Sequence, residues 1–87
     1  MFFVYIIQSG LDGTFYIGQT ANLEERLNNH NSGDSRYTKT KMPWLLVYTE
    51  EFDTRKKAIQ RERFLKNQRN RKFYERLIEE FNSSNNK

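Results

Sequence analysis

Apolar residues along the chain form three short runs, each of which predicts a β-strand. Residues 2–7 are apolar at every position and rich in aromatic and β-branched side chains, a pattern typical of a central strand covered on both faces. Turn residues at 9–13 separate this run from residues 14–18, so the two strands are expected to form a hairpin. A third strand is predicted at residues 44–49, directly after Pro43.

Helical patterns occupy the sequence between and after these runs. Asn22 is a favourable N-cap and Glu25 holds the capping-box position, which predicts a helix to about residue 31. A polar, basic loop is expected at 36–41. A second helix, capped by Asp53 or Thr54, is predicted to run to about residue 67.

A last helix is predicted at about residues 71–81, because apolar side chains recur there at helical spacing. The order ββαβαα predicts an α/β fold of the α+β kind, a small three-stranded antiparallel sheet flanked by helices. We expect one domain over residues 1–82 and a polar C-terminal tail at 83–87.

Composition narrows the class of protein. A chain of 87 residues suffices for one modest core. It contains no cysteine, so disulfides, thiolate metal sites and cysteine nucleophiles are excluded, and a cytoplasmic location is expected. No apolar run approaches the roughly 20 residues of a membrane-spanning helix, so no membrane partner is expected.

The distribution of charge indicates a polyanionic partner. The formal net charge is only +4, yet ten Lys or Arg residues face three acidic residues between positions 53 and 76. The alternative for such a run is a solvated helical surface. The candidate nucleic-acid-binding residues are Arg55, Lys56, Arg63, Lys66 and Arg69.

Glu62 does not fit a purely solvated helix surface. At about 100° per residue it falls between Ala58 and Leu65, on the only apolar stripe of the second helix. A buried carboxylate must be paired, hydrogen-bonded or bound to a metal, because an isolated buried charge is too costly. The structural alternative to a metal is a salt bridge to a neighbouring arginine.

Arg26 and His30 lie four residues apart on the first predicted helix, beside Leu23 and Leu27. We therefore expect both at the edge of its buried face. A guanidinium there can hold two phosphate oxygens at once. A surface arginine and a partly buried, hydrogen-bonded histidine are the structural alternatives.

Tyr5 and Tyr16 stand on adjacent strands of the predicted hairpin, where core packing is the ordinary role of a tyrosine. Gly18 is expected to end the second strand and to leave room near the Tyr16 ring. Glycine-rich phosphate loops, nucleophile elbows and paired-histidine zinc motifs are absent from the sequence. Tyrosine, arginine, histidine and one glutamate are therefore the available catalytic chemistry.

The spacing of these residues resembles that of the GIY-YIG nuclease family. Val4-Tyr5-Ile6, with valine in place of the family's glycine, is followed by Tyr16-Ile17-Gly18, and the match spans about residues 2–80. The chain looks most like the small, stand-alone bacterial members. Further matching positions are Thr20, Asn22, Leu23, Arg26, His30, Asn31, Gly33, Tyr37, Thr38, Pro43 to Tyr48, Ala58, Arg61, Glu62, Leu65, Lys66, Leu77 and Ile78.

This resemblance implies a metal-assisted phosphodiesterase. Our first hypothesis is therefore a divalent-metal-dependent endonuclease that hydrolyses phosphodiester bonds in DNA, with branched, nicked or damaged DNA in repair or processing as the candidate substrates. It implies that Glu62 binds Mg²⁺ (or Mn²⁺) and that Tyr5 helps to activate the attacking water. Tyr16, Arg26 and His30 would contact or orient the phosphate. One glutamate is enough because Mg²⁺ keeps several waters and takes few protein ligands. Next to Arg26 and a metal-bound water, we expect the phenolate form of Tyr5 to be favoured.

Two non-enzymatic alternatives stay open: a nucleic-acid-binding module that retains the fold, and a protein-interaction domain. The presence of all five polar residues favours the enzyme, since a binding module needs only the basic surface. DNA is the expected substrate, with RNA as an alternative. Characterised members usually have a separate DNA-recognition domain, so a protein partner could supply DNA targeting here.

Overall fold

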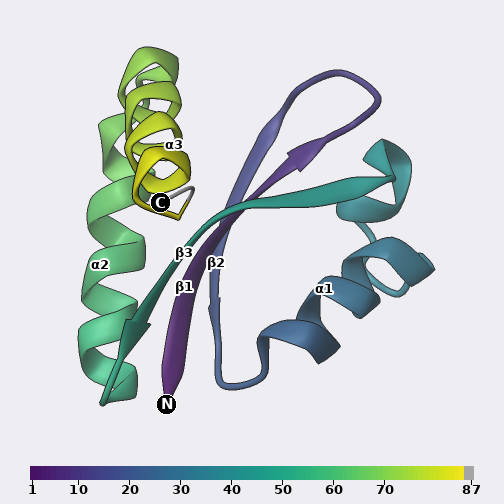
Figure 1. Ribbon diagram of the computed structural model, residues 1–87. Helices are drawn as coiled ribbons and strands as arrows, with labels where there is room; N and C mark the ends of the chain where they lie inside the picture. The colour runs from purple at the N-terminus through teal and green to yellow at the C-terminus, as the bar shows by residue number, and fades with distance from the viewer. Residues whose placement is uncertain (86–87) are drawn as a thin grey trace.

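The computed structural model describes residues 1–85 and contains a three-stranded antiparallel sheet between helical layers (Figure 1). The central strand is β1 (Phe2–Ser9), flanked by β2 (Phe15–Thr20) and β3 (Trp44–Phe52). The predicted order and antiparallel sheet are confirmed. All three strands continue past their predicted ends, because pairing with the neighbouring strand sets where a strand stops.

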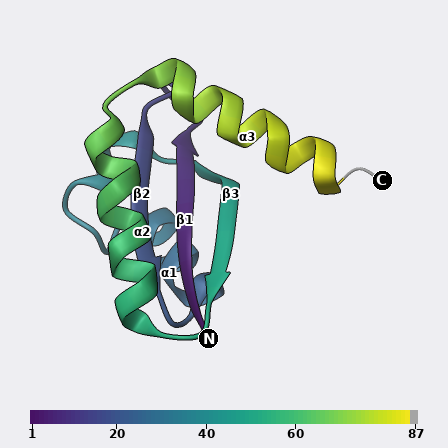
Figure 2. The same cartoon turned by 90° about the vertical axis from the view of Figure 1, so that its left-hand side faces the viewer.

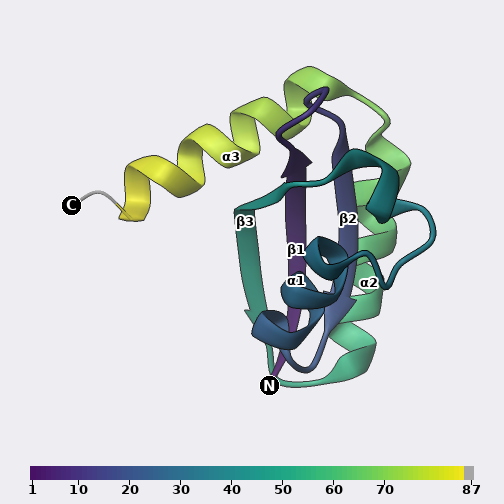
Figure 3. The same ribbon diagram turned by 90° about the vertical axis from the view of Figure 1, so that its right-hand side faces the viewer.

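Helix α1 (Leu23–Ser32) covers one face of the sheet, and α2 (Arg55–Gln68) and α3 (Arg71–Asn85) lie on the other side (Figures 1 and 3). The predicted caps are present: Asn22 Oδ1 accepts from the Glu25 amide at 3.1 Å. At α2 the cap is Thr54, which accepts from the Lys57 amide at 3.2 Å.

The predicted end of the last helix, at about residue 81, is too early. Helix α3 continues to Asn85, since no glycine or proline interrupts residues 82–85. Residues 86 and 87 of the predicted tail lie outside the described residues. The second half of α3 projects away from the sheet on the β3 side (Figure 2).

The predicted polar loop at 36–41 contains a short 3₁₀ turn, η1 (Thr38–Lys41). Although this segment is polar, the Thr38 side chain is fully buried. The indole Nε1 of Trp44 donates to the Thr38 carbonyl at 2.8 Å, which fixes the turn against the sheet.

The sheet separates two apolar clusters, because successive side chains of a strand point to opposite faces. Tyr5, Ile7 and Trp44 pack on the α1 face. The α2 and α3 side is larger and holds Val4, Ile6, Ile17, Tyr48, Ala58, Leu65 and Tyr74. Within residues 1–85, no helix has the length and apolar character that a bilayer crossing requires.

Candidate active site

Tyr5 lies on the α1 face of the central strand, and its ring reaches across the neighbouring strand β2. The register pairs Tyr5 with Gly18. A Cβ atom added to Gly18 would meet the Tyr5 hydroxyl at 2.5 Å and Cζ at 2.7 Å. The Tyr5 ring therefore lies directly over the Gly18 backbone, with its hydroxyl above the outer strand of the sheet.

The structure corrects the predicted role of Gly18. This glycine sits inside β2, which continues to Thr20, and does not end the strand. The ring for which it leaves room is that of Tyr5 and not that of Tyr16. The sequence could not show this, because the contact depends on the register between the two strands.

A buried chain of hydrogen bonds runs behind the Tyr5 hydroxyl. His30 Nε2 lies 3.0 Å from the Tyr5 hydroxyl oxygen. On the other side of the same imidazole, Nδ1 lies 2.9 Å from Thr38 Oγ1. The side chains of His30 and Thr38 are both fully buried, and Tyr5 is 2% exposed. The imidazole thus connects strand β1 to the η1 turn.

His30 is fully buried, and not at the edge of the helix face as expected. Its position seven residues after Leu23 places it within about 20° of that leucine around α1, a signal the pairing with Arg26 obscured. Burial, helped by the charge of Arg26, lowers the pKa of His30 to about 4. Both ring nitrogens are engaged, so His30 holds Tyr5 instead of facing a phosphate.

Arg26 is half-buried on α1, one helical turn before His30. Tyr5, and to a smaller extent Tyr16, raise the pKa of Arg26. A permanently charged, planar group therefore lies near both tyrosines. This is the arrangement expected of a residue that binds phosphate oxygens.

Burial is the main influence on the acidity of Tyr5 in the protein alone. Burial raises the pKa of Tyr5 to about 12, although the nearby Arg26 acts in the opposite direction. The charge of Glu62 contributes to the rise as well. The effect of desolvation on the pKa of Tyr5 is thus larger than that of the Arg26 charge, and at neutral pH the resting protein holds Tyr5 as a neutral phenol.

Tyr16 completes the aromatic wall of the site. Its ring centroid lies 4.9 Å from that of His30 in an edge-to-face arrangement and 6.5 Å from that of Tyr5. Tyr16 is only partly buried, and the ring of Tyr37 lies 6.1 Å beyond it. Four rings, those of His30, Tyr5, Tyr16 and Tyr37, extend from the buried imidazole to the surface, where Tyr37 is 54% exposed.

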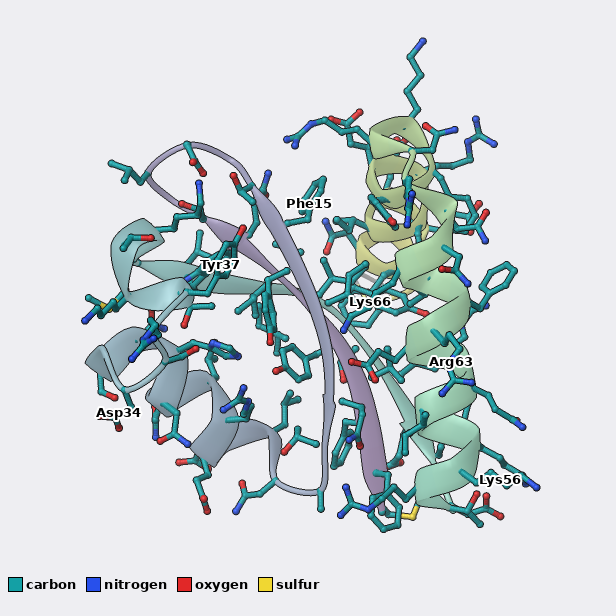
Figure 4. The ribbon with its side chains drawn as sticks, turned by 180° about the vertical axis from the view of Figure 1, so that it is seen from behind. Phe15, Asp34, Tyr37, Lys56, Arg63 and Lys66 are labelled. Carbon is teal, nitrogen blue, oxygen red and sulfur yellow. The ribbon has the colours of Figure 1, made fainter. Side chains whose placement is uncertain are left out.

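Glu62 lies on α2, in the helical layer on the other side of the sheet from α1. On α2, Arg61 reaches β3, where its Nε lies 2.9 Å from a carboxylate oxygen of Glu50. At about 100° per residue, Glu62 and Lys66 then lie on the flank of α2 that faces β2. Figure 4 agrees, since Lys66 extends from α2 toward the strands.

The Glu62 carboxylate is partly accessible, with 19% of its side chain exposed. It forms an ion pair with Lys66 at 3.0 Å, so a lysine takes the place of the arginine in the structural alternative. No group of three or more metal-binding side chains occurs within residues 1–85. A cation here would have Glu62 as its one acidic protein ligand, which fits the few protein ligands that Mg²⁺ requires.

The candidate nucleic-acid-binding residues are all exposed. At about 100° per residue, the four that lie within α2 occupy one side of this helix. They do not share one direction, since Lys66 extends toward the strands and Lys56 away from them (Figure 4). Arg69 follows the helix in a left-handed conformation with φ 47°.

Thr38 is the member of this site that the analysis of the sequence missed. It lies in a polar segment, and no pattern there predicts a buried hydroxyl. The one indication in the sequence that Thr38 belongs to the site was its place among the positions that resemble the GIY-YIG family. Its contact with His30 depends on how η1 folds back onto α1.

Comparison of the sequence with known protein families finds a match. A family model described as the GIY-YIG catalytic domain matches residues 1–85. A UPF0213 protein of Bacillus licheniformis is 42% identical over 77 residues, covering 87% of this chain and 78% of that protein. A UPF0213 protein of Halobacterium salinarum is 41% identical over 63 residues, covering 71% and 80%.

A solved structure is similar as well. The solution NMR structure of a UPF0213 protein from Bacillus halodurans aligns with a TM-score of 0.57 and 32% sequence identity. The alignment covers 91% of this chain and 84% of that one. The arrangement of three strands and three helices therefore recurs in a related protein of bacterial origin.

Proposed function

Because this chain belongs to the GIY-YIG family, we propose that it is a divalent-metal-dependent endonuclease that hydrolyses phosphodiester bonds in DNA. The observation that carries the proposal is the convergence of Tyr5, Tyr16 and Arg26 on one face of the sheet. A core tyrosine needs no permanently charged partner, whereas a site for phosphate does.

Each residue has a role that its position permits. Arg26 would bind the phosphate oxygens and share the negative charge that develops during hydrolysis. Tyr5 would accept the proton of the attacking water once its own proton is lost, and Tyr16 would orient the phosphate. His30 would hold the Tyr5 hydroxyl from behind.

Glu62 would hold the metal ion. When bound, Mg²⁺ or Mn²⁺ supplies positive charge that stabilises the leaving oxygen. Lys66 now neutralises the Glu62 carboxylate, so the cation would replace the lysine as its partner. The exposed basic residues of α2 would add affinity for the DNA backbone that does not depend on sequence.

The substrate in this proposal is branched, nicked or damaged DNA, encountered in DNA repair or processing. The test is a cleavage assay on a panel of single-stranded, duplex, nicked and branched DNA, with matched RNA, in the presence of Mg²⁺, Mn²⁺ or a chelator. Cleavage that requires the cation supports the proposal. Salt-dependent binding without cleavage of any substrate would leave a nucleic-acid-binding module.

A further inference from the structure

Thr38 has no place in the roles described so far, although it is one of the most buried polar side chains of the described chain. Its hydroxyl lies 2.9 Å from His30 Nδ1. Within residues 1–85 the Thr38 hydroxyl has no other hydrogen-bond partner. Its backbone carbonyl is separately occupied by Trp44.

The hydrogen atoms of this buried chain can be assigned by counting donors and acceptors. If Nδ1 carried the hydrogen, it would donate to Thr38 Oγ1, and the hydroxyl hydrogen of Thr38 would be left without an acceptor. A buried donor left unpaired is costly. If Thr38 donates to Nδ1 instead, its hydrogen has a partner, and the hydrogen of the Tyr5 hydroxyl gives up the imidazole as its acceptor. Tyr5 keeps 2% exposure whereas Thr38 has none, so water can accept the hydrogen of Tyr5 but not that of Thr38. A neutral imidazole then carries its one hydrogen on Nε2.

We propose that Thr38 is a positioning residue of the active site, which fixes His30 as the Nε2–H tautomer so that His30 donates to the Tyr5 oxygen. The catalytic part of this inference rests on the proposed nuclease function. The low pKa of His30, about 4, agrees with a neutral imidazole at physiological pH. Tautomers of this kind are set by the hydrogen bond that the other ring nitrogen makes.

This assignment changes what happens at Tyr5. His30 then presents a donor to the phenolic oxygen, and the nearby charge of Arg26 also acts to lower the pKa of Tyr5. A donor and a positive charge both stabilise the phenolate more than the phenol, because an anionic acceptor forms the stronger hydrogen bonds. His30 cannot accept the Tyr5 proton in this tautomer, so the proton must leave on the open side of the hydroxyl. Thr38 thus favours ionisation of Tyr5 without touching it.

The single histidine of the chain makes the tautomer directly measurable. In ¹⁵N-labelled protein, NMR correlations of the imidazole distinguish the protonated ring nitrogen from the unprotonated one. We expect the hydrogen on Nε2 in the wild type and in Thr38→Ser, which keeps the hydroxyl. In Thr38→Val, which keeps the shape, we expect the Nδ1–H tautomer to become populated.

Turnover provides the second measurement. Thr38→Val should lower kcat by about ten- to a hundred-fold, the effect of one hydrogen bond to a charged group, and Thr38→Ser should restore most of it. Fluorescence of Trp44, the only tryptophan, checks that the η1 turn stays folded.

Two results would overturn the inference: an Nδ1–H tautomer in the wild type, or a folded Thr38→Val protein with unchanged tautomer and rate. The tautomer is read without substrate. A wild type that cleaves nothing while showing Nε2–H therefore contradicts the proposed function and the catalytic role of Thr38, but not the hydrogen assignment.

Discussion

Glu62 and Lys66 are one helical turn apart, and both side chains are partly exposed. An exposed pair of this kind contributes about 0–1 kcal/mol to stability. We therefore expect Glu62→Gln to leave the melting temperature and DNA affinity nearly unchanged while abolishing cleavage, because the amide keeps the volume but cannot hold the cation. Cleavage rates at saturating DNA, with circular dichroism for the fold, check this.

Lys66→Gln is the matched control, since it removes the same ion pair and leaves the carboxylate. It should weaken DNA binding and retain kcat. If Lys66→Gln abolished cleavage as completely as Glu62→Gln, the carboxylate would have no role beyond its ion pair.

Tyr5→Phe removes one hydroxyl and leaves the ring over Gly18. We expect kcat to fall by roughly a hundred- to ten-thousand-fold, as for a lost acid–base group. Stability should fall by about 1 kcal/mol, because His30 loses a partner. Wild-type rates should rise with pH through the alkaline range, since the pKa of Tyr5 is about 12 and only the phenolate accepts a proton. A folded Tyr5→Phe protein with the wild-type rate would remove Tyr5 from the mechanism.

His30 gives the protein a defined sensitivity to acid. The folded-state pKa of His30 is about 4, below the ordinary value of 6.5, so the unfolded chain binds more protons between these values. Stability should therefore fall as pH decreases from about 6.5 and stop responding to His30 below about 4. Urea unfolding at several pH values measures this slope. His30→Gln should flatten it, and an equally steep slope in that variant would assign the acid sensitivity to other groups.

At the scale of the elements, the contact between β1 and β2 decides the geometry of the site. Gly18→Ala would place a methyl group 2.5 Å from the Tyr5 hydroxyl in the present geometry, so the ring or the strand must shift. We expect a loss of about 1–3 kcal/mol in the free energy of unfolding and a large loss of kcat.

A double-mutant cycle separates this contact from a general effect on β2. In a Tyr5→Leu background, the smaller side chain leaves room, and Gly18→Ala should cost clearly less free energy of unfolding than in the wild type. Equal costs in the two backgrounds would show that the contact with the Tyr5 ring is not the reason for the glycine.

The elements were predictable because each rests on local signals. The apolar run at 2–7 and the caps Asn22 and Thr54 determine where strands and helices begin. The contacts within the site were less predictable. Neither the placement of Tyr5 over Gly18 nor the burial of Thr38 follows from any local pattern, because both depend on register and on the folding of η1.

At the scale of the whole molecule, binding to DNA should weaken steeply with added salt, since each neutralised phosphate releases counterions. We expect Lys56→Gln and Arg63→Gln each to reduce the slope of log K against log salt by about 1. Lys57 lies on the opposite side of α2 and pairs with Asp53 at 3.1 Å. Lys57→Gln is therefore the matched control, because it also removes one positive charge. Fluorescence anisotropy on one DNA across a salt series measures all three. Equal effects of the three substitutions would show that net charge, and not one side of α2, governs binding.

The position of Tyr5 on the central strand links the lifetime of the activity to that of the fold. Many enzymes carry their reactive groups on loops, which open locally and lose activity before the rest of the protein melts. Here the hydroxyl that we propose to be reactive belongs to the strand that is paired on both sides. The backbone that carries it is lost only when the sheet itself separates. Heat should therefore inactivate this protein over the same temperature range, and at the same rate, as it unfolds the sheet.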